Sequence, residues 1–328
     1  MRLFIELPSW LGDGVMASAS IENLALNFTN LTPKEPLEIV FFGSFASIEL
    51  YKTQPNCKQA ILDESKKIAP KLSFLKPIYR LIYLRKLAKK LGDFDLAISF
   101  RSHLASKVLI NAVNAQKKAV FSPKIKAEHQ VLKYLDFVNN ALNLQPLNKD
   151  LKLHFKPLKK QSRARLGINA GASYGDAKRW GASNFAKVAK EMAKDYDIFI
   201  FGAKGEEQIA DDIAKDLSAA SINYTNLCAK TSIKELCEHI ASLDLFITND
   251  SGPMHIACAF KVPLIAIFGP TRVDETAPYG NERAKIIKLD LPCMPCMRRS
   301  CPLGHHDCMR LITPQMVLDK IKELKALC

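Results

Sequence analysis

Residues 3–20, LFIELPSWLGDGVMASAS, join an apolar run to a glycine-bracketed acid and then to a stretch of small residues. The run Leu3–Leu7 predicts a buried strand, and a helix is expected to begin near Gly14. A strand that passes through a glycine turn into a helix is typical of α/β folds with parallel sheets. The segment Gly12–Ala17 also satisfies the dinucleotide-binding pattern G-x-G-x-x-A.

The glycine turn nevertheless argues against a nicotinamide dinucleotide as the ligand. Enzymes that bind one usually carry an acid at the end of the second strand, where it holds the ribose. The corresponding stretch here, IVFFGSFAS at 39–47, contains no acid. Asp13 would also repel a pyrophosphate bound in its own turn, because both are negatively charged. We therefore expect Asp13 to serve a different chemistry.

Strand and helix patterns alternate along the whole chain and restart near its middle. The first half is predicted to contain strands at Leu3–Leu7, Leu37–Phe42, Asp95–Phe100 and Ala119–Phe121, with helices that begin near Gly14, Ser44, Pro77, Ser102 and His129. The second half is predicted to contain strands at Leu166–Ala170, Ile198–Phe201, Asn223–Leu227, Leu243–Thr248 and Leu264–Phe268, with helices at Ser183–Lys194, Glu206–Ala219, Ser232–Ala241 and Pro253–Phe260.

This pattern predicts two Rossmann-like domains, residues 1–155 and 156–328, with mostly parallel sheets that face each other across a ligand-binding cleft. The polar, lysine-rich stretch 147–165 is the candidate linker. A helix from Pro314 to Leu327 is expected to end the chain, with a position against the first domain as one option for its packing.

The composition is that of a soluble globular protein, because 48% of the 328 residues are hydrophobic and 24% are charged. No apolar run approaches the roughly 20 residues of a membrane-spanning helix. The N-terminus also lacks the features of a signal peptide. We therefore expect a cytoplasmic protein.

Positive charge concentrates in residues 66–90, which contain nine Lys and Arg and no Asp or Glu, in a chain of net charge +14. Apolar residues between the cations suit an amphipathic helix that binds a surface, although Pro70 and Pro77 limit its length. The segment is either a solvated helix face or a surface for an anionic partner such as phosphorylated lipid, a membrane or nucleic acid.

The second half opens with a glycine-rich turn at residues 169–180, NAGASYGDAKRW, which delivers Lys178 and Arg179. Glycines allow backbone N–H groups to approach an anion, and the two cations neutralise it. This arrangement suits a diphosphate, and a plain surface turn is the alternative.

Two further motifs place polar groups after predicted strands. Residues 246–257, FITNDSGPMHIA, turn through Asp250 into a helix that carries His255. Residues 267–280, IFGPTRVDETAPYG, repeat the strand-and-glycine pattern and add Thr271. Parallel sheets bind ligands at the carboxyl ends of their strands, although helix capping also explains a single acid or serine there.

Taken in order, LPSWLGDGVMA (7–17), NAGASYGDAKRW (169–180), TNDSGPMHIA (248–257) and FGPT (268–271) resemble the bacterial heptosyltransferases of glycosyltransferase family nine. The resemblance covers nearly the whole chain, and Gly181 stands where the family more often has proline. It implies a GT-B fold and an inverting, metal-independent transfer of L-glycero-D-manno-heptose. The donor would be ADP-heptose, and the acceptor the lipopolysaccharide inner core at the anionic inner leaflet of the cytoplasmic membrane. Within the family, the enzymes that add the second heptose, to heptosyl-Kdo2-lipid A, are the most similar.

The resemblance also implies how the residues divide the chemistry. Asp13 is the expected catalytic base, because a sugar hydroxyl attacks poorly until its proton is accepted; capping of the following helix is its alternative role. Lys178 is expected to neutralise the ADP leaving group. The expected donor-binding residues are Ser173, Lys178, Arg179, Asn226, Asp250, Ser251, Gly252 and His255, and the expected acceptor-binding residues are Trp10, Gly12 and Gly14.

Four of the nine cysteines, Cys293, Cys296, Cys301 and Cys308, lie close together in the sequence, with His305 and His306 between the last two. Such spacing raises a structural zinc site, and a reduced, packed loop is the alternative. The reaction itself is expected to need no metal and no cofactor, since ADP-heptose is a substrate.

Two other functions remain open from the sequence. One is a different GT-B enzyme that acts on a sugar nucleotide. The other is a basic protein that binds polyanions or membranes without catalysis, which leaves the four motifs unexplained. Signatures of RNA-binding domains are absent, so a nucleic-acid partner is not expected. Whether the acceptor already carries one heptose, and how it is phosphorylated, is left open.

Overall fold

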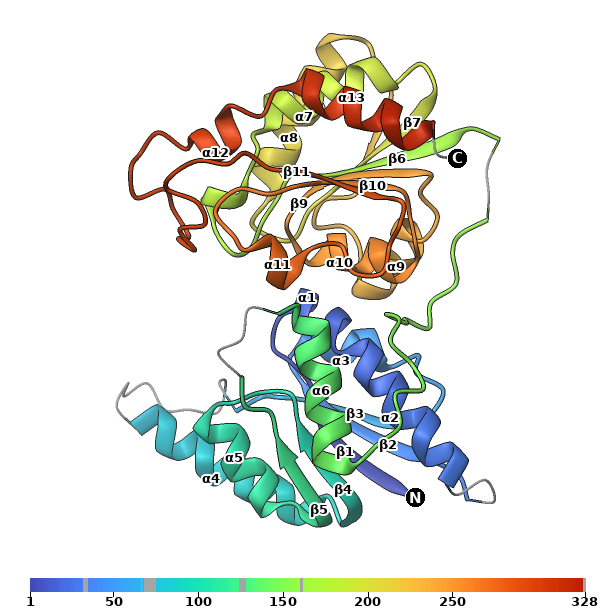
Figure 1. Cartoon of the computed structure of the whole chain (residues 1–328), viewed down its shortest axis with the longest axis vertical. Helices are drawn as coiled ribbons and strands as arrows, with labels where there is room; N and C mark the ends of the chain where they lie inside the picture. The colour runs from blue at the N-terminus through green and yellow to red at the C-terminus, as the bar shows by residue number, and fades with distance from the viewer. Residues whose placement is uncertain (32–34, 66, 68–74, 124–127, 160–161, 327–328) are drawn as a thin grey trace. The chain divides into compact units, whose positions relative to one another are not determined.

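The computed structural model describes residues 1–31, 35–65, 67, 75–123, 128–159 and 162–326. The chain divides into two compact units, Met1–His154 and Phe155–Cys328. Each unit contains one parallel sheet with helices on both of its faces (Figure 1). The predicted fold class, α/β with two mostly parallel sheets, is therefore confirmed.

The first unit has a five-stranded sheet in the order β3-β2-β1-β4-β5. Its strands are β1 Arg2–Glu6, β2 Glu38–Gly43, β3 Cys57–Leu62, β4 Asp93–Ser99 and β5 Asn114–Val120. Its helices are α1 Leu11–Met16, α2 Ser18–Leu31, α3 Phe45–Tyr51, α4 Lys76–Lys90, α5 Leu104–Ala112 and α6 Gln130–Leu142. Neighbouring strands all run parallel, as crossovers through helices require.

Alternate residues of each central strand fill the two faces of this sheet. Phe4, Phe42 and Ala97 pack with α4 and α5 in one buried cluster. Phe41 points to the opposite face, where its ring lies 5.0 Å from that of Tyr51 on α3. Because every second side chain of a strand faces the same side, strands buried on both faces read as continuous apolar runs, which is why β1, β2 and β4 were predictable.

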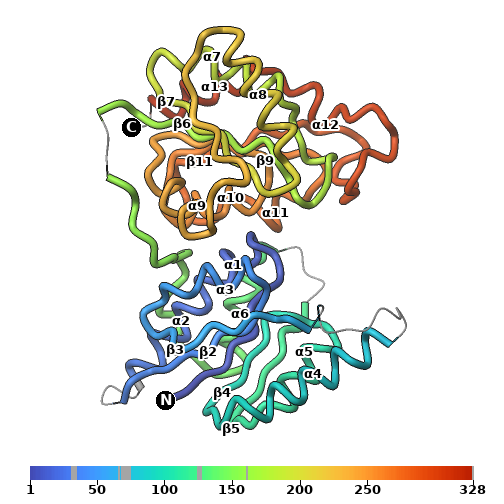
Figure 2. Tube along the Cα trace, turned by 180° about the vertical axis from the view of Figure 1, so that it is seen from behind, coloured from blue at the N-terminus to red at the C-terminus, as the bar shows by residue number. Residues whose placement is uncertain are grey.

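The second unit has a six-stranded sheet in the order β11-β10-β9-β6-β7-β8. Its strands are β6 Ala164–Asn169, β7 Tyr196–Phe201, β8 Tyr224–Asn226, β9 Leu245–Asn249, β10 Leu264–Ile267 and β11 Ala284–Ile287. Its helices are α7 Ala182–Met192, α8 Glu207–Ala219, α9 Ile233–Ile240, α10 Gly252–Ala259, α11 Val273–Thr276, α12 Asp307–Arg310 and α13 Pro314–Lys325, with a single 3-10 turn at Asp176–Lys178. In Figure 2, α7, α8 and α13 cover one face of this sheet, and α9, α10 and α11 cover the other.

The terminal helix α13 packs within the second unit. Val317, Ile321 and Leu324 are buried in the same cluster as Phe185 of α7 and the strand residue Ile265. The apolar face of this helix completes the core of its own unit, and packing of the helix against the first domain stays a prediction.

Three strands differ from the sequence prediction. Strands β3 and β11 were not predicted, and β5 begins five residues before the predicted Ala119–Phe121. All three lie at an edge of a sheet, and in β3 and β5 several side chains are exposed. In β3, for example, Lys58 and Gln59 are exposed, so its sequence lacks the apolar run that marked the central strands.

The candidate linker at 147–165 is bound in place over its first part. Lys152 donates its backbone N–H to the Ser18 hydroxyl over 3.0 Å, and Leu151 and Leu153 are buried. Farther along, the backbone N–H of Leu158 donates to the Ser242 hydroxyl over 2.7 Å. The linker is thus shorter than predicted, because apolar residues alternate among its lysines; residues 160–161 lie outside the described chain.

Helix α4 carries the described part of the basic segment 66–90, of which residues 66 and 68–74 lie outside the described residues. Ile78, Tyr79 and Ile82 are exposed large apolar side chains on this helix. Its last two residues, Lys89 and Lys90, are exposed cations. Within the described ranges, no helix has the combination of length and apolar character needed to cross a membrane.

Glu22 on α2 binds the returning chain at residues 152–154. Its carboxylate oxygens lie 3.2 Å from Lys152 Nζ and 3.2 Å from His154 Nε2. The hydrogen bond from His154, together with Lys152, lowers the pKa of Glu22 to about 2. A lowered pKa in the folded state means that the ionised carboxylate stabilises the unit above the ordinary value of 4.5, and that this stabilisation is lost as the pH falls toward 2.

The substitution Glu22→Gln is expected to lower the free energy of unfolding by about 1–3 kcal/mol at pH 7, because a charge-assisted contact is removed. The loss should shrink to roughly half near pH 3. Urea titrations at both pH values measure it, with Glu64→Gln as the control that removes an exposed pair with Lys67. An equal destabilisation at both pH values would contradict the role of the Glu22 charge.

Candidate active site

The strand order of the second sheet reverses between β6 and β9, which are neighbours at its centre. The amide side chains that end these strands connect the two following loops. Asn249 donates to the Ala170 carbonyl over 2.7 Å, and Asn169 donates to the Ser251 hydroxyl over 3.2 Å. Ligands of open α/β sheets bind at such a reversal point, so these loops form the floor of a candidate site.

Lys178 and Asp250 meet above this floor in a buried ion pair. Lys178 Nζ lies 2.6 Å from Asp250 Oδ2 and also donates to the Asp250 carbonyl over 3.2 Å. The Thr271 hydroxyl donates to the same Oδ2 over 2.6 Å. All three residues are at least nine-tenths buried. The motifs at 169–180, 246–257 and 267–280 therefore each contribute one residue to a single cluster.

The alternative role of Asp250 and Ser251 as helix caps was wrong for both side chains. Ser251 occupies the N-cap position of α10 but makes no capping hydrogen bond with its side chain. The carboxylate of Asp250 is instead bound by Lys178 and Thr271. A buried carboxylate beside a buried ammonium binds that charge in preference to backbone N–H groups at a helix end.

The glycine-rich turn is supported by the cysteine-rich segment. The backbone N–H of Ala177 donates to the Arg299 carbonyl over 3.0 Å, and the Tyr174 hydroxyl donates to the Met297 carbonyl over 2.8 Å. A Cβ at Gly175 would lie 2.2 Å from the Arg299 carbonyl oxygen. The turn therefore needs glycine there because another backbone passes against it.

The four clustered cysteines are free thiols. Among the residues that the structure describes, no group of three or more His, Cys, Asp or Glu side chains has an arrangement that could hold a metal ion. Burial and the neighbouring Cys296, Cys301 and Cys293 raise the pKa of the Cys308 thiol to about 11, whereas backbone hydrogen bonds lower the pKa of Cys301. The zinc site and the packed loop both stay predictions for this segment.

The other predicted donor residues lie on the same edge of the sheet. Gly252 and His255 belong to α10, and His255 is buried. Asn226 ends β8, two strands away from β6, and its side chain accepts from the Cys228 N–H over 3.0 Å. Ser173 and Arg179 flank the turn, exposed and half-buried respectively.

Glu206 is a site candidate that the sequence analysis missed. It follows β7, and its carboxylate accepts from the Ala203 N–H over 2.8 Å. A Cβ at Gly171 would lie 2.0 Å from Glu206 Oε2, so the carboxylate packs directly against the glycine-rich turn. An acid after the second strand is a typical ribose ligand. The acid expected after a second strand is therefore present in the second half of the chain. The sequence analysis considered this position only in the first half, where the G-x-G-x-x-A pattern lies.

In the first unit, Asp13 lies in the first turn of helix α1. The expected helix start near Gly14 was therefore wrong: α1 begins at Leu11, with Trp10 at its N-cap, and both Gly12 and Gly14 are helical. Asp13 is consequently not an N-cap residue. Trp10 is 54% exposed, and a Cβ at Gly14 would come within 3.1 Å of Leu50 Cδ1.

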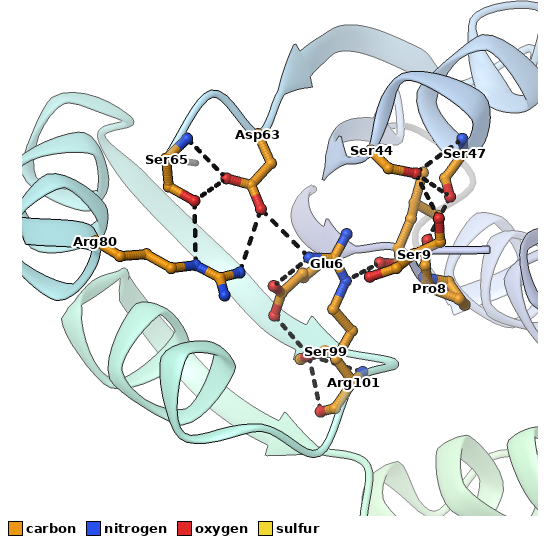
Figure 3. Close-up of polar contacts among 11 residues, drawn as sticks. Glu6, Pro8, Ser9, Ser44, Ser47, Asp63, Ser65, Arg80, Ser99 and Arg101 are labelled. Atoms are coloured by element: carbon orange, nitrogen blue, oxygen red, sulfur yellow. Dashed lines mark hydrogen bonds and ion pairs between the residues drawn. The ribbon is translucent and has the colours of Figure 1, made fainter. Parts of the chain in front are cut away.

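The first sheet reverses its strand order between β1 and β4. Side chains that follow these strands and β3 form the polar network in Figure 3, in which Arg101 lies between two carboxylates. Its Nη1 is 3.4 Å from Glu6 Oε1 and 3.4 Å from Asp63 Oδ2. Burial raises the pKa of Glu6, and the Arg101 guanidinium partly opposes that rise.

A cavity of about 470 Å³ opens beside this network, where α4 and α5 begin. Its lining consists of Ser65, Lys76, Pro77, Arg80, Leu81, Leu104 and Ala105. Arg80 connects the cavity to the network, since it donates to the Ser65 hydroxyl over 3.1 Å and lies 3.5 Å from Asp63 Oδ2. The cavity thus combines apolar walls with two cations.

Comparison with known proteins identifies the family. The model of glycosyltransferase family 9 (heptosyltransferase) matches residues 144–306. The chain is 44% identical to lipooligosaccharide heptosyltransferase 2 of Campylobacter jejuni, over 99% of this chain and 98% of that one. The chain belongs to glycosyltransferase family 9.

Solved structures of family members show the same fold. The ADP-heptose lipopolysaccharide heptosyltransferase II of Escherichia coli matches with a TM-score of 0.72 at 22% identity, over 99% of this chain and 98% of that one. Heptosyltransferase WaaC of E. coli with ADP matches with a TM-score of 0.76 at 14% identity, over 99% of this chain and all of that one. These structures show that the chain has the GT-B fold. Its membership of family 9 makes it a glycosyltransferase, which decides against a polyanion-binding protein without catalysis.

In this family 9 chain, Lys178→Met and Asp250→Asn are each expected to cost about 3–5 kcal/mol of unfolding free energy, because each leaves a buried charge without its partner. The double variant should lose less than the sum of the two. Denaturant titration measures all three, with exposed Lys215→Met on α8 as a control that changes little. Additive losses would show that the two charges do not act as a pair.

Proposed function

We propose that this heptosyltransferase of lipopolysaccharide core biosynthesis transfers the second L-glycero-D-manno-heptose from ADP-heptose to an inner core that already carries one. The observation that carries the proposal is the 44% identity, over nearly the full length of both chains, with a lipooligosaccharide heptosyltransferase 2. The geometry of the two sheets supports it, because each presents charged residues at its reversal point. The donor is assigned to the second unit and the acceptor to the first.

The Lys178–Asp250 cluster supports binding of the donor diphosphate. Two of the three N–H donors of Lys178 go to Asp250, and we assign the third to a phosphoryl oxygen. Asp250 holds the ammonium in one orientation, so positive charge is in place when ADP departs. Glu206 is assigned to the ribose hydroxyls because its carboxylate lies against the glycine-rich turn. Asn226, farther along the sheet edge, is assigned to the adenosine.

Asp13 is assigned the role of general base on the acceptor. Its carboxylate takes the proton from the acceptor hydroxyl while the oxygen of that hydroxyl forms a bond to the anomeric carbon. The bond from that carbon to the diphosphate breaks on the opposite side, so the configuration inverts. Lys178 supplies the positive charge that a divalent cation supplies in other transferases, and the reaction is accordingly proposed to be independent of metals and cofactors.

The first unit is suited to an acidic, membrane-anchored acceptor. Lys76 and Arg80 line the cavity beside the polar network, and α4 presents exposed apolar residues and several exposed cations. Such a helix can lie on an anionic bilayer. We assign the enzyme to the cytoplasm, peripheral to the inner leaflet of the cytoplasmic membrane.

The function is tested by incubating the protein with ADP-heptose and two core acceptors, one without heptose and one with a single heptose. Mass spectrometry is expected to show addition of one heptosyl group to the second acceptor only, with and without EDTA. NMR of the product should show an anomeric configuration opposite to that of the donor. Transfer to the heptose-free core would assign the first heptose instead, and loss of transfer in EDTA would refute metal independence.

Asp13→Asn is expected to lower kcat by about 10²–10⁴-fold, because the side chain keeps its size and loses its proton acceptor. Stability should change less than activity, since Asn has nearly the same size as Asp and an acid in the first turn of a helix contributes about 0.3–1 kcal/mol through the helix dipole. Steady-state kinetics measure kcat, a thermal melt measures stability, and an ADP titration checks that the affinity for ADP is unchanged. A kcat equal to that of the unmodified enzyme would remove Asp13 as the base.

Replacing Lys86, Lys89 and Lys90 with Gln is expected to weaken binding to anionic liposomes and to flatten its dependence on salt, because screened surface charges carry this attraction. The matched control replaces Lys187, Lys194 and Lys215, which are exposed in the second unit, and removes the same charge. Liposome co-sedimentation across a salt series measures both variants. Equal loss in the two would show that only net charge matters.

A further inference from the structure

The residues on both sides of Asp13 are bound through their carbonyl oxygens. Four side chains donate these hydrogen bonds: Arg101 Nε to Leu7 over 2.6 Å, Ser47 to Pro8, Ser44 to Ser9 over 2.8 Å, and Tyr51 to Gly14 over 2.7 Å. Figure 3 shows the first three. Arg101 comes from the loop after β4 and the two serines from the start of α3, and all three bind residues 7–9, which connect β1 to α1. We call these residues the four carbonyl donors.

The four carbonyl donors restrict residues 7–14 more than is needed to satisfy the hydrogen-bonding capacity of their carbonyl groups. Carbonyl groups near a surface are satisfied by water as readily as by side chains. Here, three consecutive carbonyls before α1 and one within it, at Gly14, are each bound by a different side chain. Asp13 lies between the two tethered stretches, so neither end of its segment is free to shift.

Arg101 makes more contacts than its hydrogen bond to the Leu7 carbonyl requires. Its side chain is 7% exposed and lies between the carboxylates of Glu6 and Asp63, which are also buried. The Ser99 hydroxyl donates to Glu6 over 2.7 Å and accepts from the Arg101 backbone N–H over 3.0 Å. Burying charges costs several kcal/mol that the pairing does not fully return, so the arrangement is better explained by a fixed geometry than by stability.

We propose that Arg101 and Tyr51 are positioning residues for heptosyl transfer, which act by fixing the backbone on either side of Asp13. The inference rests on the proposed role of Asp13 as the base. Proton transfer requires the base within hydrogen-bond reach of the acceptor hydroxyl. A displacement of about 1 Å can cost on the order of 100-fold in rate. The carbonyl donors prevent such a displacement without touching a substrate.

Tyr51→Phe is the mildest test, because it removes only the hydroxyl bound to the Gly14 carbonyl and keeps the ring packed on Phe41. We expect kcat to fall about 10-fold, and that of Arg101→Lys about 100-fold. The KM for ADP-heptose and the affinity for ADP should stay unchanged. Tyr196→Phe, at the amino end of β7 in the second unit, is the matched control and should retain the original kcat.

A double-mutant cycle separates positioning from a plain structural role. In the Asp13→Asn background, Tyr51→Phe and Arg101→Lys are expected to have no further effect on kcat, because there is no base left to position. Reductions that multiply would overturn the proposal, as would a kcat unchanged by Tyr51→Phe with only the Tm lowered. If Arg101→Lys does not fold, Tyr51→Phe and Ser47→Ala decide the outcome.

The cycle also distinguishes failure of this inference from failure of the proposed function. Asp13→Asn alone tests whether Asp13 is the general base. An unchanged kcat in that variant refutes this role, and with it the proposal that Arg101 and Tyr51 position the base. A large loss in Asp13→Asn together with unchanged Tyr51→Phe refutes positioning alone. Heptosyl transfer by the unmodified enzyme is measured in the same assay.

Discussion

Both sheets reverse their strand order beside their first strand, and this reversal fixes where chemistry can occur. The loops after the two central strands leave toward opposite faces of the sheet, so a space opens between them. In the first unit the space lies between β1 and β4, beside Arg101, and in the second between β6 and β9, beside Lys178. Three of the four motifs that resemble family 9 begin at the ends of β1, β6 and β9, and the fourth follows β10.

At both reversal points, buried charges are paired with each other and bound to backbone. Arg101 lies between Glu6 and Asp63 and binds the Leu7 carbonyl. Lys178 is paired with Asp250 and binds its carbonyl. Such pairs add little net stability. They do fix the positions of loops that strands alone leave mobile, which is what a reaction between a held donor and a held acceptor requires.

The central strands and most helices were predictable because they are apolar on both faces or periodic on one. The edge strand β3 was not, since Lys58 and Gln59 are exposed and interrupt its apolar pattern, and β11 was not, since it has only four residues, one of them a lysine. The motifs that contain Lys178 and Asp250 were found in the sequence, but the contact between the two side chains was not. The residues are separated by 71 others, and only the strand order shows which loops lie side by side at a sheet edge. Arg101 was missed for the same reason: it follows a strand, yet only the fold shows what its side chain binds. Glu206 was missed because an acid after the second strand was sought in the first half of the chain alone.

The most direct test of the account is the pH dependence of kcat for heptosyl transfer in the unmodified enzyme and in Asp13→Asn. If Asp13 accepts the proton of the acceptor hydroxyl, kcat of the unmodified enzyme falls about tenfold per pH unit on the acid side of its profile, because the base becomes protonated. Asp13→Asn should show a low kcat without that acid limb. The same acid limb in both proteins would show that another group accepts the proton, and would contradict the account.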